Sequence, residues 1–541
     1  VFIISFLSIA WKVSSFFLVE IPADKGVLTE GVIGTPRFIN PILAISDADR
    51  DMVALIYSGL MRADNKGGLI PDLAEKFTIS DDGLIYTFTL KPNLVWPDGN
   101  PLTSDDIVFT VEKTKDPVVK SPKRGGWEGV NIEKIDDNSL RFVLEKPYAS
   151  FLENATIGIL PKHVWNNVSI DQISSSNLNV MPLGSGPYQI NKISRNPGGI
   201  ITSYELTANK KFSLGKPHIK KFILRFYPSE KELINAYLRG EIESISAVTP
   251  QTLEKIKKNS QTIKTISLPR AFGVFFNQNN AKVFTQKDVR QALDVSVDRK
   301  KIISEVLRGF GTELFHPLPP GTLGALMEQE ESNFSAEAAK AILEKNGWIK
   351  NEEKGILEKK IKGEIFQLSF SVSTSDAPEL KQTAELLKEM WEGIGAKVDV
   401  KIFEAGDLNQ NVIRPRKYDS LLFGQITGRD PDLFVFWHSS QRNDPGLNIA
   451  LYANIRADKI LEETRSERDS ESRREKYQEF QAEVENDIPA IFLFSPKFVY
   501  LIPSNLGGME QTQSIIAPPE RFSMVHNWYK ETDKVWKIFA K

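Results

Sequence analysis

The sequence predicts an α/β protein of two lobes, with strands rather than a flexible linker passing between the lobes. A chain of 541 residues is too long for one hydrophobic core and is typical of roughly two to four domains. Its second half alternates strand, helix and strand with short connections, which is the pattern of a βαβ unit with parallel pairing. Neither an internal repeat nor a low-complexity linker interrupts the chain. The strands themselves are therefore expected to join the lobes.

The composition is that of an ordinary globular protein, with 41% hydrophobic and 26% charged residues. The formal net charge of −2 provides no basic field, which argues against nucleic acid as a partner. The chain has no cysteine. Disulfides, thiolate metal sites, a cysteine nucleophile and a lipid-bearing cysteine are therefore all excluded.

The N-terminal segment is strongly apolar, and Lys12 and Glu20 are its only charged residues up to position 21. Two interpretations are open: the end of a transmembrane anchor, or the apolar region of a signal peptide. No cleavage site of small residues precedes Asp24, which favours an uncleaved anchor within residues 1–25. Since the chain starts with Val1 rather than Met, this segment is expected to be truncated. Under either interpretation, the rest of the chain lies outside the cytoplasm.

The first half is predicted to be rich in strands. A helix is expected to begin at Asp47 or Asp49, because Met52, Leu55 and Ile56 recur at helical spacing. Alternating or continuous apolar runs bounded by turn residues predict the strands. The expected strands are 84–91, 140–144, 188–193, 200–206, 221–227, 263–268 and 273–277.

The second half alternates more regularly. The expected elements are a helix over 336–346, a strand over 365–372, a helix from about 378 to 393 and a strand over 397–403. Residues 456–485 predict one long helix whose Glu and Arg residues form a solvated face. Residues 490–500 predict a strongly apolar strand.

The stretch 418–440 combines features of a ligand site. An apolar run at 421–423 predicts a buried strand, and Gly424 and the small or neutral residues after it leave backbone amides approachable. Arg429 to Asp432 form a turn signal, and aromatic residues follow. Such a combination is typical of ligand sites, but it is equally typical of the edge of an aromatic core. These residues alone leave both interpretations open.

No pattern of catalytic or metal-binding residues is found. The five histidines are scattered, without an HExxH motif or a pair at helical spacing. Neither a GxSxG elbow nor a GxxxxGK[ST] loop occurs. Asp430 and Asp432 are interpreted as capping groups of a turn rather than as a glycosidase pair. The sequence therefore predicts that the protein is not an enzyme and holds neither a metal nor a cofactor.

Several motifs, in this order, resemble those of one family. They are GLIYTFTLKPNLVWPDGNPLTSDDIVFT at 83–110, ILPKHVW at 159–165, GSGPY at 184–188, RAFGVFFNQNNAKVFTQKDVRQALDVSVDR at 270–299, the stretch 418–440 and DIPA at 487–490. Together they resemble the extracytoplasmic solute-binding proteins of peptide and nickel ABC transporters, called family 5. The resemblance covers about residues 27–510.

The resemblance implies a periplasmic-binding-protein-like fold of class II, large type, with a hinge of crossing strands. Residues 26–271 and 490–541 would form the first lobe, with an inserted subdomain at about 45–182. Residues 272–489 would form the second lobe. The crossing strands would be 272–277 and 490–500. Arg290 is then expected to pack the lobe rather than to lie on a helix surface.

The resemblance also implies a function. The protein would capture a peptide-like, extended solute between its lobes and deliver it to the permease of an ABC importer with its ATPase. It would act as a monomer in the periplasm or at the cell surface, tethered to the membrane by its N-terminal helix. The alternatives are a membrane-tethered sensor or interaction protein with the same fold, and a binder of a non-peptide solute such as a nickel complex or an oligosaccharide.

The predicted ligand-binding residues come from both lobes, on the pattern of relatives that hold a peptide as an added strand. They are Arg37, Phe38, Asn40, Gly186, Tyr188, Phe275, Asn277, Gln425, Ile426, Thr427, Asp430 and Trp437. Trp96, Trp127 and Phe436 are further candidates for pocket walls, with the core as their alternative place.

The sequence departs from the family's peptide binders at one point. Those proteins usually carry Trp near the start of the strand, and an Asp before the turn that pairs with the α-amine of the peptide. Here Gln425 and Thr427 stand in these places. A neutral Thr offers no charge-assisted bond to an ammonium group, so recognition of a free N-terminus is not expected.

Overall fold

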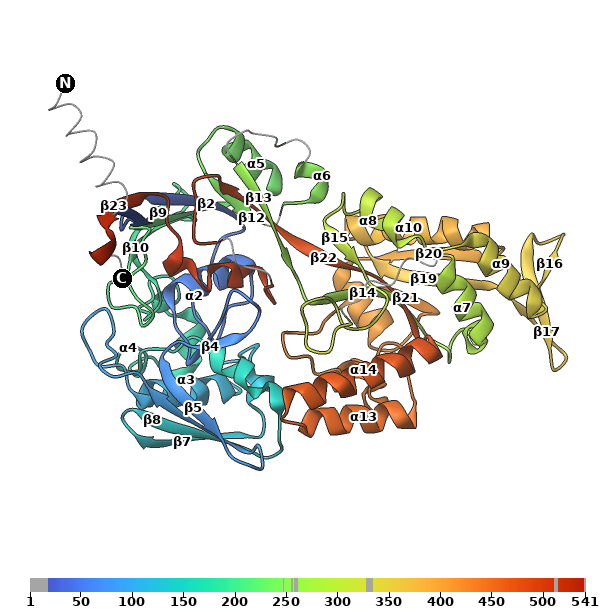
Figure 1. Cartoon of the computed structure of the whole chain (residues 1–541), viewed down its shortest axis with the longest axis horizontal. Helices are drawn as coiled ribbons and strands as arrows, with labels where there is room; N and C mark the ends of the chain where they lie inside the picture. Colours follow the sequence, from blue (N-terminus) through green and yellow to red (C-terminus); the bar gives the residue numbers. More distant parts are fainter. Residues whose placement is uncertain are drawn as a thin grey trace, which may run out of the picture.

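The computed structural model describes residues 18–246, 248–253, 256, 261–326, 334–509 and 514–539. Figure 1 shows two bodies joined by the long strand β22 (Ala490–Pro503) and by the chain that leads from β13 (Gln261–Ser267) into β14 (Arg270–Phe276). The body that contains the N-terminal half is called the first lobe here, and the body that contains β14 the second lobe. The prediction of a two-lobed α/β fold is confirmed.

In the described part of the chain, twelve strands form one mixed sheet that extends through both lobes. Besides β13, its first-lobe strands are β2 (Val27–Ile33), β9 (Tyr188–Arg195), β10 (Ile201–Ala208), β11 (Lys221–Tyr227) and β12 (Ser244–Ser246). Besides β14, its second-lobe strands are β15 (Gly311–Glu313), β19 (Ser369–Ser375), β20 (Lys397–Phe403) and β21 (Ser420–Ile426). The expected βαβ unit is present, because β19 and β20 are parallel and α10 (Pro378–Gly393) connects them.

One of the two passages between the lobes is made by a continuous strand, as predicted, and the other by the short junction of two strands. β22 pairs with β14 and β15 in the second lobe and with β12 and β13 in the first. The other passage lies earlier than the predicted residues 272–277, which are already within the second lobe. It lies at Leu268 and Pro269, where the proline, having no backbone N–H, ends the ladder of β13 before β14 begins.

A second, antiparallel sheet and several helices complete the first lobe. Its strand order is β5 (Ala74–Ile79), β6 (Ile85–Leu90), β8 (Ser139–Leu144) and β7 (Val130–Asp136). The remaining elements are the hairpin of β3 (Met61–Ala63) and β4 (Leu69–Pro71), and the helices α2 (Asp47–Ile56), α3 (Ser104–Lys115), α4 (Lys162–Trp165), α5 (Glu230–Leu238) and α6 (Pro250–Leu253). Tyr86, Phe88 and Leu90 of β6 are buried, which confirms the alternation predicted there.

Helices cover both faces of the sheet in the second lobe. Leu421 and Leu422, neighbours on β21, belong to different buried clusters, because successive side chains of a strand face opposite sides. The helices are α7 (Lys287–Val295), α8 (Arg299–Glu305), α9 (Ala336–Lys345), α10, α11 (Ala405–Asp407), α12 (Phe434–Trp437), α13 (Ile455–Ser466) and α14 (Ser470–Asp487). A small sheet of β16 (Ile349–Asn351), β17 (Ile356–Ile361) and β18 (Glu364–Gln367) lies at its edge.

Two predicted elements are each divided in the structure. The strand expected over 365–372 consists of β18 and the start of β19, which belong to different sheets. The helix expected over 456–485 consists of α13 and α14, because Asp469 caps a new helix by accepting a hydrogen bond from the Ser472 amide.

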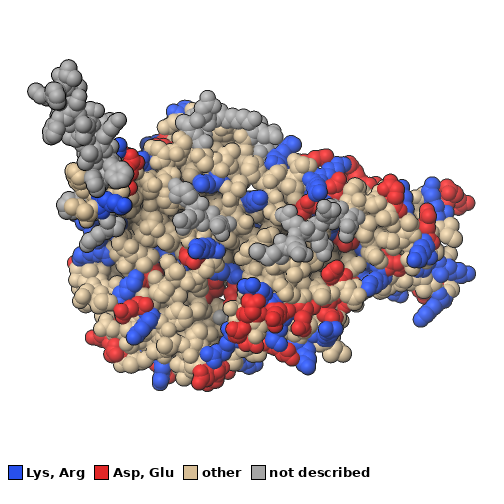
Figure 2. Space-filling view, viewed as in Figure 1, with Lys and Arg blue, Asp and Glu red and all other residues tan. Residues whose placement is uncertain are grey.

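The helices α13 and α14 are also more than a solvated face. Figure 2 shows charges of both signs over their outward side. Ile460, Leu461, Phe480 and Val484 are nevertheless buried in the second lobe. The two helices are therefore packed elements that contribute to the core.

Arg290 packs the second lobe, as expected, but it does so through carbonyl groups. Its side chain is 6% exposed. The guanidinium donates to the carbonyl of Phe284 at 2.6 Å and to that of Asp487 at 2.7 Å. These bonds connect the start of α7 to the end of α14.

The predicted N-terminal anchor falls mostly outside the described residues, which begin at position 18. Its last part is corrected: β1 (Leu18–Pro22) is a strand, paired antiparallel with β23 (Thr532–Trp536). Among the described residues, no helix has the length and apolar character needed to cross a membrane.

We expect His526 to make the first lobe sensitive to acid. Burial, together with the nearby positive charge of Arg62, lowers the pKa of this side chain to about 4. In the unfolded chain this histidine binds a proton near pH 6.5. The contribution of the neutral imidazole to the free energy of unfolding is therefore complete above pH 6.5 and is lost as the pH falls towards 4. A pKa difference of this size corresponds to about 3 kcal/mol.

The measurement is the free energy of unfolding of the wild type and of His526→Phe between pH 7 and pH 4. The phenyl ring keeps the packing against Phe212, whose ring centroid lies 5.4 Å from that of His526. The wild type should lose more stability than the variant over this range. Equal pH dependence in the two proteins would contradict the prediction.

Candidate functional site

A cavity of about 1000 Å³ lies where the two lobes meet. The turn between β3 and β4, residues 66–68, lines it from the first lobe. Residues from 309 to 326 around β15, the helix α8 and Arg429 line it from the second lobe. Ser267 and Lys497, on the strands that pass between the lobes, complete the described lining. A solute in this cavity would touch both lobes, so its binding would be coupled to their closure.

The segment 309–326 was not among the predicted site residues. Its sequence signal is the Pro- and Gly-rich run HPLPPGT, which is typical of a loop. Gly324 has a φ of +82°, and a Cβ added there would lie 2.5 Å from the Cβ of Tyr477. The loop backbone is therefore seated closely on α14.

Arg429 links the second lobe to the first. Its two terminal nitrogens each lie 2.8 Å from a carboxylate of the first lobe, one of Glu153 and the other of Glu520. The side chain of Arg429 is only 9% exposed, so these bonds are shielded from water. Burial raises the pKa of Glu153, although Arg429 opposes this effect.

The turn that carries Arg429 is fixed to α13 and α14 by its two acids. Asp430 lies 2.7 Å from Arg473, and Asp432 lies 2.9 Å from Arg465. Burial raises the pKa of Asp432, and Arg465 opposes this effect. The sequence predicts that the two acids cap the turn, and in the structure both hold it through ion pairs with arginines.

Asp430 also lies at a second cavity between the lobes. This cavity has a volume of about 430 Å³ and is lined by Tyr86 and Ser150 of the first lobe and by Arg473 of the second. The Ser150 hydroxyl donates to the carbonyl of Asp430 at 3.2 Å. The Arg473 guanidinium donates to both carboxylate oxygens of Asp430, at 2.7 and 2.9 Å.

Thr427 lies at the passage between the lobes and not in the large cavity. Its amide and its hydroxyl both donate to the carbonyl of Pro269, at 2.9 and 3.1 Å. Its side chain is buried, so the hydroxyl serves the junction between β13 and β14. Gln425 is also buried, and neither atom of its amide group has a partner among the described residues. Ile426, between them, is 52% exposed.

Most other predicted ligand residues are used inside the lobes. The Asn40 amide donates to the side chain of Asn179 at 3.0 Å, and the Tyr188 hydroxyl donates to the carbonyl of Ile219 at 3.1 Å. The Asn277 amide donates to the carbonyl of Arg416 at 3.0 Å. All three side chains are buried, so no face of them is open to a solute in this structure.

The remaining predicted residues are also placed away from the large cavity. Gly186 lies against α2, where its amide donates to the carbonyl of Ile56 at 2.8 Å. Phe275 and Trp437 belong to a buried cluster of the second lobe. Arg37 is exposed and Phe38 is half-buried, and the Arg37 guanidinium lies 5.7 Å from the Phe38 ring. The contact of these residues with a solute stays a prediction.

The three further aromatic candidates have different surroundings. Trp96 is fully buried and its indole lies 3.4 Å from the carboxylate of Asp106. Trp127 is buried beside Phe142. Phe436 packs at the edge of the same cluster as Trp437. The core, the alternative considered for them, is where the structure places these rings.

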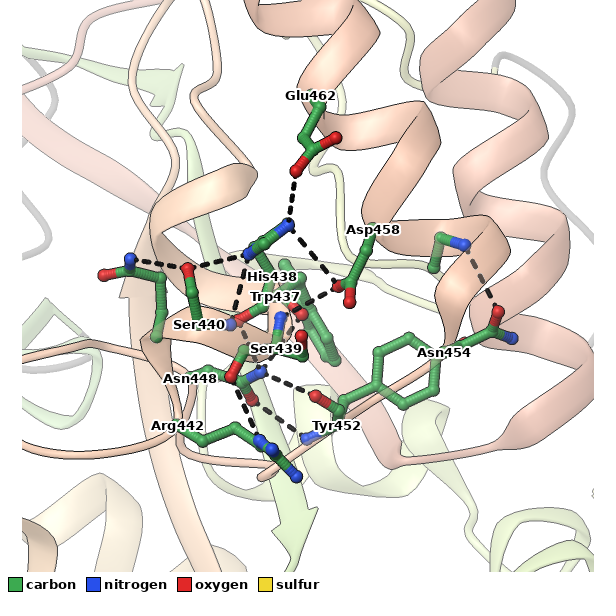
Figure 3. A network of polar contacts seen from close by, with 12 residues as sticks. Trp437, His438, Ser439, Ser440, Arg442, Asn448, Tyr452, Asn454, Asp458 and Glu462 are labelled. Atoms are coloured by element: carbon green, nitrogen blue, oxygen red, sulfur yellow. Dashed lines mark hydrogen bonds and ion pairs between the residues drawn. The ribbon is translucent and has the colours of Figure 1, made fainter.

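The segment after the turn is held by a polar network, shown in Figure 3. The Asn448 amide donates to the carbonyls of Trp437, His438 and Tyr452, at 3.0, 3.1 and 2.9 Å. The imidazole of His438 lies 3.4 Å from a carboxylate oxygen of Glu462 on α13. These contacts fix α12 and hence the direction in which Arg429 leaves the second lobe.

The fold and the interlobe cavity define a class of proteins, the two-lobed α/β proteins that bind a solute between lobes joined by strands. Residues 68–446 match the family "Bacterial extracellular solute-binding proteins, family 5 Middle". The chain belongs to this family, as its motifs predicted, and the family is extracytoplasmic.

Relatives with known names cover almost the whole chain. The oligopeptide-binding protein AppA of Bacillus subtilis is 29% identical over 497 residues, which are 90% of this chain and 89% of AppA. Its structure with a nonapeptide has a TM-score of 0.69, with 28% identity, and covers 94% of this chain and 99% of AppA. The ABC transporter substrate-binding protein CtaP of Listeria monocytogenes has a TM-score of 0.78, with 26% identity, and covers 94% of this chain and all of CtaP (100%).

Proposed function

We propose that the protein is the solute-binding component of an ABC importer for peptides. It would enclose an extended, peptide-like solute between its lobes and deliver it to a permease that works with an ATPase. The observation that carries this proposal is the cavity of about 1000 Å³, whose described lining comes from both lobes. A space of this size is at the upper end of the range for small-molecule sites and leaves room for several residues of a peptide.

The lobe division supports closure as the mechanism. We propose a first lobe of residues 26–271 and 490–541, with a subdomain inserted at about 45–182, and a second lobe of 272–489. One buried cluster gathers residues 28–268 and 498–528, whereas two others gather residues between 271 and 494. This grouping favours a boundary within β22, slightly after position 490.

Delivery would take place at the outer face of the membrane. We propose that the protein acts there as a monomer, tethered by an N-terminal segment that lies in residues 1–17, outside the described part. The predicted ligand contacts of Ile426 and of the backbone around it remain part of the proposal, because Ile426 is exposed beside the passage between the lobes.

The test is native mass spectrometry of the purified protein, followed by calorimetric titration with peptides of two to nine residues, a range chosen to include the length of the AppA ligand. Co-purified peptide, or micromolar binding, would support the proposal. Absence of co-purified peptide together with no binding across the series would overturn it.

We expect Arg429→Met to weaken solute binding by about tenfold, which corresponds to 1.4 kcal/mol. The change removes two shielded ion pairs between the lobes and leaves Glu153 and Glu520 facing each other. Since both pairs form only when the lobes approach, the closed state becomes less populated.

The measurement combines titration with the radius of gyration from small-angle X-ray scattering, with and without peptide. Arg474→Met on α14 is the matched control, because Arg474 pairs with Glu471 of the same helix. The Arg429 variant should be more extended without peptide, and the control should equal the wild type. An unchanged radius and affinity for the Arg429 variant would contradict the prediction.

We expect N-acetylated and free peptides to bind with affinities within a few-fold of each other. The Thr427 hydroxyl is occupied by Pro269, and the Asp430 carboxylate by Arg473. The measurement is paired titration of the two forms of one peptide. A loss of about a hundredfold on acetylation, roughly 2.7 kcal/mol, would show that an acid recognises the amine, and Glu313→Gln would then test the acid in the cavity lining.

A further inference from the structure

Three of the described lysines line the interlobe cavity and come from separate parts of the chain. Lys66 is in the turn between β3 and β4, Lys300 is in α8, and Lys497 is in β22. Within the described ranges, none of the three ammonium groups has a carboxylate partner. Lysines that stabilised the fold by ion pairs would have such partners, as Lys359 has in Asp288 at 3.2 Å.

The other charged groups of the lining do not cancel this excess. The guanidinium of Arg429 is already paired with two carboxylates, those of Glu153 and Glu520, which are not among the described lining residues. Glu313 is the acidic side chain among the described lining residues, and its Oε2 is buried. Among the described lining residues, three lysines without a carboxylate partner therefore stand against one acidic side chain, that of Glu313.

The excess is local rather than a property of the whole chain, whose formal net charge is −2. A hollow with one sign of charge and walls of low dielectric constant concentrates the field and attracts ions of the opposite sign. Lysine carries its charge as a compact group on a flexible stem, so it can meet carboxylates at variable positions. Such a lining suits a class of solutes better than one fixed geometry.

We propose that the cavity selects acidic peptides, which carry the carboxylates of Glu or Asp side chains in addition to the C-terminal carboxylate. This inference rests on the proposed function and narrows its substrate class. The three lysines would meet the carboxylates of the solute when the lobes close. The loop 309–326 and the turn 66–68 would contribute mainly backbone, which tolerates different side chains.

The test uses three pentapeptides of equal length: Ala-Glu-Ala-Glu-Ala, Ala-Gln-Ala-Gln-Ala and Ala-Lys-Ala-Lys-Ala. We expect the acidic peptide to bind the wild type at least about tenfold more tightly than the neutral one, and the basic peptide to bind most weakly. The preference should fall when the salt concentration is raised from 50 to about 500 mM, because ions screen exposed charges.

Variants then assign the effect to the lysines. Lys66→Gln, Lys300→Gln and Lys497→Gln should each lower the affinity for the acidic peptide by about three- to tenfold and change that for the neutral peptide by less than about twofold. Lys301→Gln is the matched control on the same helix, because Lys301 does not belong to the lining. Thermal unfolding of each variant would show that the fold is intact.

The outcomes separate this inference from the proposed function. Equal binding of the acidic and neutral peptides would overturn the inference but not the proposed function. An acidic preference that persists in all three lysine variants would have the same consequence. Failure of all three peptides to bind would overturn the inference, and the proposed function would then be decided by the co-purified ligand and the series of peptide lengths.

Discussion

Replacing Arg521 with Met should lower the free energy of unfolding of the first lobe by about 3–5 kcal/mol, because it leaves two buried carboxylates without their counter-charge. Arg521 is fully buried. Its guanidinium lies 2.7 Å from Glu30 on β2 and 2.5 Å from Asp51 on α2. The Tyr500 hydroxyl of β22 donates to the other oxygen of Glu30 at 2.5 Å. The loss therefore affects the centre of the lobe and one of its crossing strands.

The measurement is denaturant unfolding, with hydrogen exchange at β2 to assign the loss to the first lobe. Arg239→Met is the control, because Arg239 forms an exposed pair with Glu241, and its stability should equal that of the wild type. Burial raises the pKa of Asp51 to about 6 even beside Arg521. The penalty should therefore shrink between pH 7 and pH 5, as the orphaned carboxylate binds a proton.

A triple variant distinguishes the charge from the packing. Adding Glu30→Gln and Asp51→Asn to Arg521→Met replaces the buried ions by neutral groups of similar shape. Recovery of a large part of the lost stability is expected, since removing all partners is less costly than removing one. A single variant as stable as the wild type, or a triple variant no more stable than the single one, would contradict the account.

The periodicity of apolar residues predicted those elements in which buried and exposed side chains follow a regular pattern. The alternation in β6 and the apolar run of β22 each have a regular burial pattern, so their strands were found from the sequence. The division of 456–485 escaped prediction because Glu and Arg residues continue through the break. The decisive feature there is one cap at Asp469.

The site was predicted less well than the fold, for a physical reason. Residue type indicates what a side chain can bind, but not whether another part of the protein already binds it. Thr427 and Asp430 carry suitable groups, yet their partners, Pro269 and Arg473, are distant in the sequence. The opposite holds for Lys300 and Lys497. No sequence motif around either lysine indicates a binding site, and only the fold brings the two residues to one cavity.

Replacing Trp437 with Ala should destabilise the second lobe by about 3–5 kcal/mol, the usual cost of removing a large aromatic side chain from a core. The indole is 1% exposed. Its ring centroid lies 6.0 Å from that of Phe275, 5.9 Å from that of Phe492 and 6.1 Å from that of Phe480. The Ala variant therefore leaves a cavity between β14, β22 and α14.

Trp437→Phe separates this packing role from the solute contact predicted for Trp437. The indole N–H is buried without a partner in the part of the chain that the structure describes, so the phenyl ring removes volume but also an unsatisfied donor. We expect Trp437→Phe to cost clearly less stability than Trp437→Ala and to bind peptide within about threefold of the wild type. Trp536→Ala, at a side chain that is 47% exposed, is the control for loss of a tryptophan.

The two interpretations of Trp437 then give opposite results. If Trp437 is a core residue, the Ala variant is less stable than the wild type and the Phe variant keeps the solute affinity. If Trp437 were part of the pocket wall, its variants would unfold at the same free energy as the wild type but bind the solute more weakly, because the indole face would be missing from the contact with the solute. Calorimetric titration and denaturant unfolding of the same two variants decide between them. Because α12 packs on the aromatic cluster, the Ala variant should also make the turn of Arg429 more mobile. The separation of the two lobes in solution should then increase.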